Sequence, residues 1–433
     1  MTRSRLLISV AGAAALALMA SLPLSTLGQS AAPTASPEVS LQPGPGASTV
    51  PVATDWGGLL WSAPVPGPDG HVQAVIPVGT TLVAVGSVQG KDRTSAAAWL
   101  SPDGVIWQQT FLEGQEGGEA QMRDVVATPN GLLAVGWSGV QHCTGSGEGG
   151  VRCTPLPVTM WTSVDGTSWT RSPSSPVLGR ADVTGLASGP SGLVAVGQQG
   201  FDQPRLWTSA DGTTWQAEQL PRDVFGKAQF DTVASVPGGW IILGAVGGTA
   251  PVPGGGAVPN GSKGAAWLSP DGQTWHQVAH IAGKGPQVEL RTLYQGAGGL
   301  VALGTRTGGQ QGTVWTSSDG ERWVLAPAVP ADTYALFPMA SDGQRIIGDS
   351  YVTGDLESFS VSGDGITWRT LVDLGATDTM PHWTGDAGTP VADSAFVLPD
   401  GVLFVGEAGG KTVTWRTTAV PVDEVPAPSP SPS

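Results

Sequence analysis

Residues 99–107 read Trp99-Leu-Ser-Pro-Asp103-Gly104-Val-Ile-Trp107, and the pattern Trp-x-Ser-x-Asp-Gly-x-x-Trp returns at 161–169, 207–215, 267–275 and 315–323. A sixth copy at 360–368 keeps the Ser, Asp, Gly and final Trp but lacks the first Trp. The copies begin 45 to 62 residues apart. A period of this length is typical of propeller blades and similar repeated units. The pattern is therefore first of all a sign of architecture.

A second repeated feature lies between the Trp patterns: a short apolar run that ends in Gly. Its seven copies occupy residues 82–86, 132–136, 193–197, 240–244, 300–304, 345–348 and 402–406. Such runs, bounded by Gly, fit strands buried on both faces. A further short strand is expected just before each, as at 124–127 and 231–234. One unit thus contains strands A and B, then C with the first Trp and D with the second. Seven units predict an all-β, seven-bladed β-propeller of four-stranded antiparallel blades.

The Asp-Gly pair predicts a tight hairpin between strands C and D. With Ser101 and Val105 as the flanking pair, Gly104 takes the left-handed position of a three-residue loop, which costs glycine no steric strain. This register places Trp99 directly opposite Trp107 as a cross-strand aromatic pair. The Asp carboxylate and the Ser hydroxyl are suited to accept backbone N–H groups within the turn.

The two ends of the repeat region complement each other. Residues 414–417 resemble a C strand with no D strand after it, and residues 59–62 resemble a D strand with no C strand before it. Pairing them would complete the seventh blade from both ends of the chain. The ring would then close and leave no open sheet edge between the first and last blades.

The Ser-x-Asp-Gly-x-x-Trp part of the pattern resembles the Asp box, the bacterial neuraminidase (BNR) repeat of sialidase-like β-propellers. The usual box, Ser-x-Asp-x-Gly-x-Thr-Trp, has one more residue between Asp and Gly, so this chain carries a shortened variant. The group includes sialidases, xyloglucan-degrading endoglucanases, sortilin-type receptors and a photosystem assembly factor. The resemblance covers residues 55–419 and implies that the boxes lie on the face opposite the ligand-binding face. It implies a structural role for Asp103, Asp165, Asp211, Asp271, Asp319 and Asp364.

The segments outside the repeats look like export and linker sequences. Arg3, Arg5 and the apolar run 6–24 predict a secretory signal peptide over residues 1–28, with an uncleaved membrane anchor as the alternative. Residues 29–54 form a Pro/Ala/Ser-rich linker, and residues 420–433 a Pro/Ser tail, both expected to be disordered. We therefore expect a monomer that is secreted or held at the cell envelope, with no membrane span after signal removal.

The charge of the chain limits the classes of partner it can bind, and its two cysteines suggest a disulfide. Lys and Arg number 20 and Asp and Glu 35, a net charge of −15, which disfavours nucleic acid and anionic lipid surfaces. The expected partner is a glycan or an extracellular protein or peptide. Cys143 and Cys153 flank a Gly-rich loop and are expected to form a local disulfide in an exported protein. No metal-binding spacing and no cofactor motif occurs, so neither a metal nor a cofactor is predicted.

Candidate binding residues come from the loops and strand starts of the face opposite the boxes. The long loops 136–158, 245–264 and 369–393 differ in length from blade to blade, and function is usually carried by such loops. The last loop combines polar and aromatic groups, and a Trp there would suit stacking against a sugar. The ligand-binding candidates are Arg123, Glu289, Arg291, Asp349, Asp378, His382, Trp383, Asp386 and Glu407.

Two functions remain open. The first is a non-catalytic propeller that binds a glycan, peptide or protein through the loop face. The alternative is a glycoside hydrolase, which needs two carboxylates across a cleft; Asp124 and Asp231 are the candidates. Sialidase chemistry is disfavoured because the first inner strand has no Arg and Tyr294, one of only three Tyr residues, falls at the wrong end of its strand. An enzyme is thus the less favoured reading.

Overall fold

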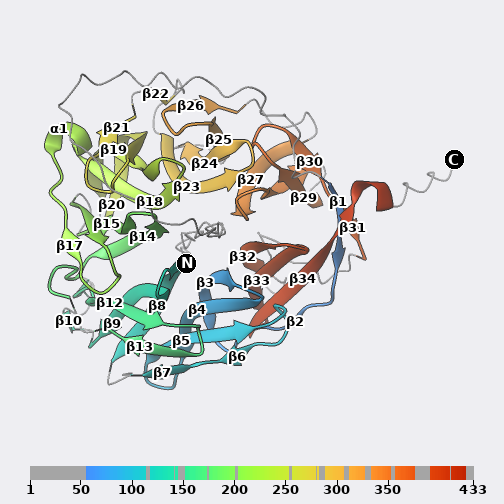
Figure 1. Cartoon of the computed structure of the whole chain (residues 1–433), viewed down its shortest axis with the longest axis horizontal. Coiled ribbons are helices and arrows are strands. Elements are labelled where there is room, and N and C mark those ends of the chain that lie inside the picture. The colour runs from blue at the N-terminus through green and yellow to red at the C-terminus, as the bar shows by residue number, and fades with distance from the viewer. Residues whose placement is uncertain are drawn as a thin grey trace, which may run out of the picture.

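The computed structural model describes residues 55–425 except 114–117, 141, 145–151, 173–174, 200–202, 253–255, 279, 282–287, 307–311, 327–332, 353–355, 376–390 and 410. Within them the predicted architecture is confirmed. Seven antiparallel sheets stand around a central axis as the blades of a propeller, with the innermost strand of each blade nearest the axis (Figure 1).

Each blade runs outward from strand A to strand D. Blade 1 contains β3 (His71–Val78), β4 (Thr81–Gln89), β5 (Thr94–Ser101) and β6 (Gln108–Gln109). Blade 2 contains β8 (Glu119–Thr128), β9 (Gly131–Gly139), β12 (Val158–Ser163) and β13 (Ser168–Arg171). Blade 3 contains β14 (Asp182–Gly189), β15 (Gly192–Gln198), β16 (Pro204–Ser209) and β17 (Gln216–Ala217). Blade 4 contains β18 (Ala228–Val236), β19 (Gly239–Val252), β20 (Gly256–Ser269) and β21 (His276–Gln277).

The remaining blades follow the same order. Blade 5 contains β23 (Val288–Gly296), β24 (Gly299–Arg306), β25 (Gly312–Ser317) and β26 (Arg322–Leu325). Blade 6 contains β27 (Thr333–Ser341), β28 (Ile346–Val352), β29 (Leu356–Ser362) and β30 (Trp368–Thr370). Blade 7 contains β32 (Val391–Leu398), β33 (Gly401–Ala408), β34 (Lys411–Pro421) and, from the start of the chain, β1 (Trp56–Trp61). The described residues also contain two short helices, α1 (Arg222–Phe225) and the 3-10 helix η2 (Val422–Glu424).

The ring closes as predicted, with both ends of the chain in blade 7. Strand β1 pairs antiparallel with β34, with Trp61 opposite Thr417, and the short strand β2 (Val65–Pro66) pairs further along β34. The N–H of Val422 donates to the carbonyl of Asp55 at 2.7 Å. Strand β34 ends at Pro421, two residues beyond the predicted end of the propeller. The predicted signal peptide and linker lie outside the described residues, as do residues 426–433 of the predicted tail.

The C–D turns show why the box residues recur. Gly104 adopts a φ of +76°, as predicted, and its N–H donates to Ser101 Oγ at 2.7 Å. The Asp103 carboxylate accepts the N–H groups of Val105 and Ile106 at 2.8 and 2.9 Å. The same Asp and Ser hydrogen bonds recur at Asp211, Asp271 and Asp364. The turn is thus built on side-chain acceptors that replace missing backbone partners.

The predicted facing of Trp99 and Trp107 is wrong. Trp99 is opposite Gln109, and in blade 6 Ser362 is opposite Trp368. The reason is that the Asp103 carboxylate keeps Val105 and Ile106 inside the turn, so strand D begins later than a three-residue loop requires. The second Trp folds back instead, and the Trp107 indole N–H donates to the carbonyl of Gly104 at 3.1 Å.

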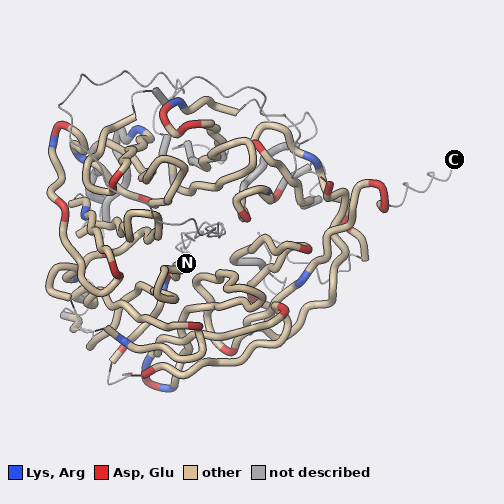
Figure 2. The backbone as a smooth tube through the Cα atoms, viewed as in Figure 1, with Lys and Arg blue, Asp and Glu red and all other residues tan. Residues whose placement is uncertain are grey.

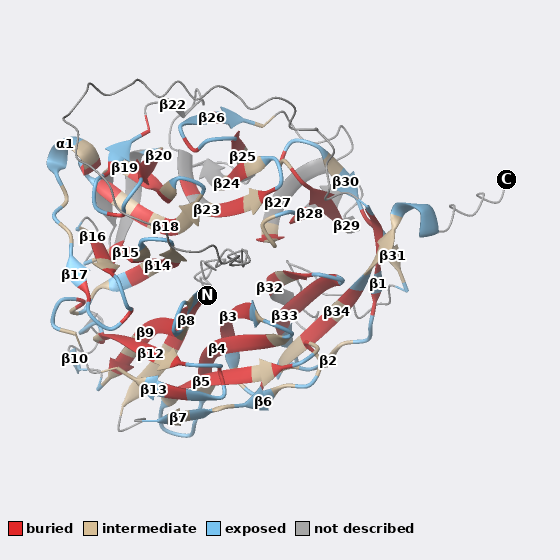
Figure 3. Cartoon of the chain, viewed as in Figure 1, coloured by how far each residue is buried: buried red, intermediate tan, exposed pale blue. Residues whose placement is uncertain are grey.

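Three blades gain a fifth, parallel strand from the connection that leaves the preceding blade. Strand β7 (Phe111–Glu113) pairs with β13, β22 (His280–Ile281) with β26, and β31 (Val372–Leu374) with β1. In blades 2 and 5 the strand D Trp pairs with the added strand, Trp169 opposite Leu112 and Trp323 opposite Ile281, and both Trp residues are completely buried. Figure 3 shows the buried strands in the middle of the blades and the exposed segments along the outer rim.

Other structural predictions fall on the loops. Cys143 of β10 (Cys143–Thr144) is directly opposite Cys153 of β11 (Arg152–Cys153). Directly opposed residues have Cα atoms roughly 4.5–5.5 Å apart, a distance that a disulfide can span. The register suits the disulfide, which stays a prediction. Among the described residues no helix has the length and apolar character needed to cross a membrane.

Candidate functional site at the bulges of the innermost strands

Two faces of the propeller differ in their chemistry. Because neighbouring strands are antiparallel, the A–B and C–D turns lie at one end of the blades and the B–C and D–A connections at the other. We call these the box face and the loop face. Strand A begins at the loop face, so residues near its start are closest to the variable loops.

Every innermost strand carries a β-bulge, which lies near this start in six blades, while in blade 6 the bulge at Met339 lies two residues nearer to the box face. In each blade the extra residue comes directly after the residue paired with the Gly of strand B, as Val72 pairs with Gly86 and Gln73 follows. The seven extra residues, named here the bulge ring, are Gln73, Arg123, Thr184, Asp231, Arg291, Met339 and Asp393. Bulges re-aim side chains and are frequent next to functional sites.

The bulges explain the glycines that end the apolar runs. A Cβ at Gly86 would lie 1.9 Å from the carbonyl oxygen of His71, and one at Gly244 would lie 1.9 Å from that of Gln229. Strand A bends so close at this point that only glycine fits. These glycines are therefore not strand ends as predicted: β4, for example, continues three residues past Gly86, to Gln89.

Three predicted binding residues, Arg123, Asp231 and Arg291, occupy equivalent bulge positions in blades 2, 4 and 5. Glu289 lies two residues before Arg291 on β23. Asp349 and Glu407 follow the strand B glycines Gly348 and Gly406 directly. The fold thus brings Arg123, Asp231 and Arg291 to one level of the ring, whereas Asp349, opposite Phe359, lies two residues nearer to the box face than Glu407, which is opposite Thr412. Asp378, His382, Trp383 and Asp386 lie outside the described residues.

Contacts at this level link neighbouring blades. The Arg123 guanidinium forms an ion pair with Asp182 at the start of β14, joining blades 2 and 3. The Thr184 hydroxyl donates to the carbonyl of Phe230 at 2.8 Å, joining blades 3 and 4. These bonds hold the bulges of three successive blades in a defined arrangement.

The two carboxylates predicted for a hydrolase occupy different environments. Asp231 is itself a bulge residue and is partly exposed. Asp124 follows the bulge of blade 2, is only 5% exposed, and accepts the N–H of Val125 at 2.8 Å. Two catalytic carboxylates must both contact substrate, and burial of Asp124 does not favour that role. Tyr294 is also buried, which raises the pKa of its phenol and keeps it from acting as a nucleophile.

Sequence reasoning missed four bulge residues: Gln73, Thr184, Met339 and Asp393. A signal for three of them exists, because in six blades the bulge residue lies 13 residues before the strand B glycine, and Met339 is the exception. Trp137, half-buried and directly after Gly136 on the same level, was also missed. Trp137 lies outside the repeated Trp pattern, and this position in the sequence could have marked it as a candidate binding residue.

Charge around the ring is mixed. Figure 2 shows acidic and basic positions scattered over the blades, without a basic region that would suit nucleic acid. Among the described residues no group of three or more His, Cys, Asp or Glu side chains is placed to hold a metal ion. The bulge ring therefore offers both hydrogen-bond donors and acceptors, without a strong electrostatic field of one sign.

No family model matches the sequence, and no curated protein is similar to it. Several solved structures resemble it in fold. A structure of YCF48 bound to D1 peptide aligns over 84% of this chain and 97% of its own, with 16% identity and a TM-score of 0.46. A PL25 ulvan lyase aligns over 85% and 96%, with 12% identity and a TM-score of 0.44. The propeller domain of the Trilobed protease from Pyrococcus furiosus aligns over 86% and 100%, with 8% identity and a TM-score of 0.44.

Proposed function

We propose that the protein is an exported, non-catalytic propeller that binds a polar ligand, a glycan or a peptide, across the bulge ring. The observation that carries the proposal is a contrast between two kinds of repeated position. Positions that the blade needs keep the same residue in copy after copy, as Ser, Asp, Gly and Trp do in the boxes. Six of the bulge positions, all but Met339, share one backbone register and carry four different residue types. The blade itself does not dictate these side chains.

The chemistry of the ring suits a ligand rich in hydrogen-bonding groups. The partly exposed Arg123, Thr184 and Asp231 supply donors and acceptors from three neighbouring blades, whereas Gln73 is buried. The Arg123 charge is already matched by Asp182, and the chain carries a net charge of −15. A polyanion is therefore disfavoured, while a neutral glycan or a zwitterionic peptide segment meets groups of both kinds.

The test scores binding and turnover separately. Wild-type protein is screened against insoluble polysaccharides and a random peptide library, with retention and product release both measured. A double variant, Arg123→Ala with Asp231→Ala, is expected to lose at least about tenfold in affinity for the retained ligand, which corresponds to about 1.4 kcal/mol. The matched control, Arg322→Ala with Asp223→Ala, removes exposed charges of the same kinds away from the ring and should bind as wild type.

Unchanged binding by the ring variant would contradict the proposal. So would release of oligosaccharide products by the wild type, which would favour the hydrolase with Asp124 and Asp231. Loss of turnover in Asp231→Asn with an unchanged melting temperature would then assign that residue a catalytic role.

A further inference from the structure

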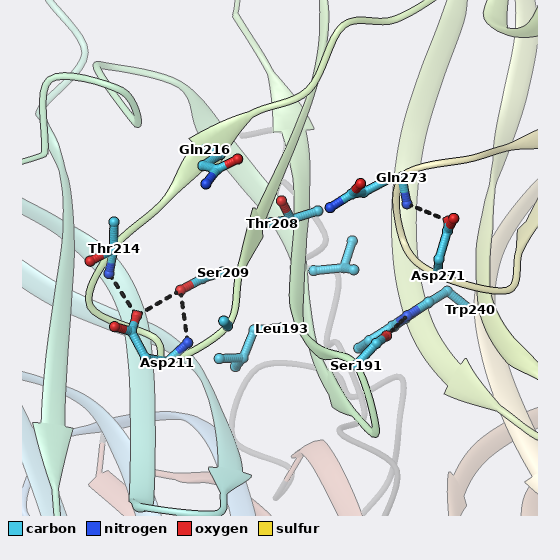
Figure 4. Close-up of a pocket in the computed structure, with 12 residues that line it drawn as sticks. Ser191, Leu193, Thr208, Ser209, Asp211, Thr214, Gln216, Trp240, Asp271 and Gln273 are labelled. Carbon is cyan, nitrogen blue, oxygen red and sulfur yellow. Dashed lines mark hydrogen bonds between the residues drawn. The ribbon is translucent and has the colours of Figure 1, made fainter. Parts of the chain in front are cut away.

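A cavity of about 240 Å³ opens on the box face at the joint between blades 3 and 4 (Figure 4). Blade 3 contributes its C–D turn and the ends of strands β15 and β16, and blade 4 contributes Trp240 and its own box turn. The cavity lies on the face opposite the bulge ring, so it belongs to a different site.

Two residues, Thr208 and Trp240, shape the cavity at this joint, and only Trp240 is particular to it. The residue after the strand C Trp faces the box turn of the next blade. In blades 1 and 4 it is Leu100 or Leu268, which approaches the box glycine Gly166 or Gly320. Blade 3 has the smaller Thr208 at that position, as blades 2 and 5 have Thr162 and Thr316. Less of the joint is then filled above the floor of the cavity.

The floor carries the second difference. The strand B residue opposite the box Ser, or opposite Thr417 in blade 7, is aliphatic in the other six blades and is Trp240 in blade 4. The Trp240 indole is 1% exposed, and its N–H donates to Ser191 Oγ at 2.9 Å, which bridges the two blades. A Cβ at Gly272 would lie 3.3 Å from the indole nitrogen of Trp240, so the box turn of blade 4 packs against this indole. Trp240 thus forms the base of the cavity and the small Thr208 borders its side, and the space between them stays open.

The lining combines an apolar base with amide groups at the rim. Figure 4 shows Gln216 from blade 3 and Gln273 from blade 4 on one side of the cavity, and Leu193, Ser191 and Trp240 on the other. Each amide supplies two donors and one acceptor oxygen. A ligand with hydroxyl groups on one side and C–H groups on the other matches this division.

The charge of the lining excludes anions. The N–H of Thr214 donates to Asp211 and holds the pKa of that carboxyl well below its usual range. The N–H of Thr274 does the same at Asp271 and lowers its pKa to about 2. No Lys, Arg or His is among the residues that line this cavity. Both carboxylates are therefore charged at any physiological pH.

Most of the acceptor capacity of these carboxylates is used within their own turns. Asp211 Oδ1 accepts from Ser209 Oγ and from the N–H groups of Thr213 and Thr214. Asp271 uses Oδ1 in the same way and accepts the Thr274 hydroxyl with Oδ2. The groups left for a ligand are chiefly the amides of Gln216 and Gln273.

We propose that this cavity binds one neutral sugar residue, free or at the end of a glycan. Its volume is below the roughly 300–1,000 Å³ typical of drug-sized ligands, so it has room for a single ring. The sugar hydroxyls meet the two Gln amides, and its C–H face turns toward the base of the cavity, where Leu193 and Val194 lie. Binding here is independent of the bulge ring.

The repeat supplies a matched pair of variants for the test. Thr208→Leu places in blade 3 the residue that blades 1 and 4 carry at the same position, and it fills the cavity. Thr162→Leu is the same change at the equivalent position of blade 2, outside the cavity. Gln273→Ala removes an amide without filling space. Thermal melting checks that all three variants fold.

Binding is measured by saturation-transfer NMR and titration calorimetry. The probes are the methyl glycosides of glucose, galactose and mannose, with glucuronate and putrescine as charged comparisons. At least one neutral glycoside should bind the wild type and Thr162→Leu equally, and Thr208→Leu and Gln273→Ala should each weaken it at least fivefold. Glucuronate should not bind.

Three results would overturn the proposal: no neutral glycoside binds, Thr208→Leu binds as well as Thr162→Leu, or glucuronate or putrescine binds in a way that Thr208→Leu abolishes. The Arg123→Ala, Asp231→Ala variant should keep this binding. Failure at one face can thus be told apart from failure at the other.

Discussion

At the scale of single residues, the box glycine has two constraints that can be separated. One is its left-handed backbone, and the other is contact with the preceding blade. Gly104 approaches Leu403, Gly212 approaches Leu133 and Gly365 approaches Val301. The box turn therefore closes a hairpin and also forms part of the joint between blades.

Gly365→Ala tests the second constraint. The new Cβ would lie 2.4 Å from Val301 Cγ2, so the joint must open. Left-handed backbone costs a non-glycine residue roughly 1–2 kcal/mol, and overpacking adds about 1–3 kcal/mol. The control is Gly343→Ala, at φ +85° in the same blade, where a Cβ would have nothing within 4 Å. Urea denaturation should show the larger loss for Gly365→Ala; equal losses would show that crowding at the joint is unimportant.

The residue scale also shows what the sequence could predict. The left-handed glycines and the Ser and Asp acceptors followed from turn chemistry, because each acts on its immediate neighbours. The register of Trp99 and Trp107 did not, since it depends on how far the Asp103 carboxylate reaches along the turn. The bulge residues were only partly found, as charged residues near strand starts. A bulge depends on how two strands pair, and no particular amino acid marks its position in the sequence.

At the scale of elements, the added parallel strands divide the blades into two kinds. Trp169 lies under β7, with Leu112 opposite it, whereas Trp107 in blade 1 has no such strand and is partly exposed. Both indoles donate to the carbonyl of their box glycine at 3.1 Å. A comparison of the two therefore isolates burial.

Trp169→Ala is expected to cost roughly 3–5 kcal/mol in the free energy of unfolding, and Trp107→Ala less than half of that. Because their turn hydrogen bonds match, the difference reports what the strand β7 covers. Guanidinium denaturation of both variants gives the two values. Similar costs would mean that the added strand contributes little.

The four-stranded blades and the closing of the ring were predictable because each rests on a repeated phrase. The added strands were not. They are two or three residues long, they lie in connections without a shared sequence, and they pair with a blade other than the one they follow. Helix α1 likewise lies in the connection that leaves one blade and packs on the next, blade 4. There Phe225 packs against Trp267, and the carbonyl of Val224 accepts the Trp267 indole N–H.

At the scale of the whole molecule, the joint between blades 7 and 1 has its own bond. Arg416 occupies the position that Leu100 and Leu268 hold in other blades. It donates to both oxygens of Asp400 at 2.8 and 2.6 Å and also to the carbonyl of Asp103 in the box of blade 1. This residue therefore links the blade built from both chain ends to the first complete blade.

Arg416→Met keeps the length of the side chain and removes these bonds, at an expected cost of about 1–2 kcal/mol. The effect should be local, so native-state hydrogen exchange should quicken in β1 and β34 and stay unchanged in β18 and β19. Arg322→Met, at an exposed position in blade 5, serves as the control. Faster exchange throughout the ring would instead indicate a loss of global stability.

The pairing of β1 with β34 also decides how the molecule responds to force. Trp56 lies opposite Pro421, so the chain enters and leaves the ring at the same end of an antiparallel ladder. Tension applied through Asp55 and Val422 would load the hydrogen bonds one after another, as in a zipper, and not all at once in shear. A pull on the two ends therefore opens blade 7 first, at low force, while the other six blades still hold their shape.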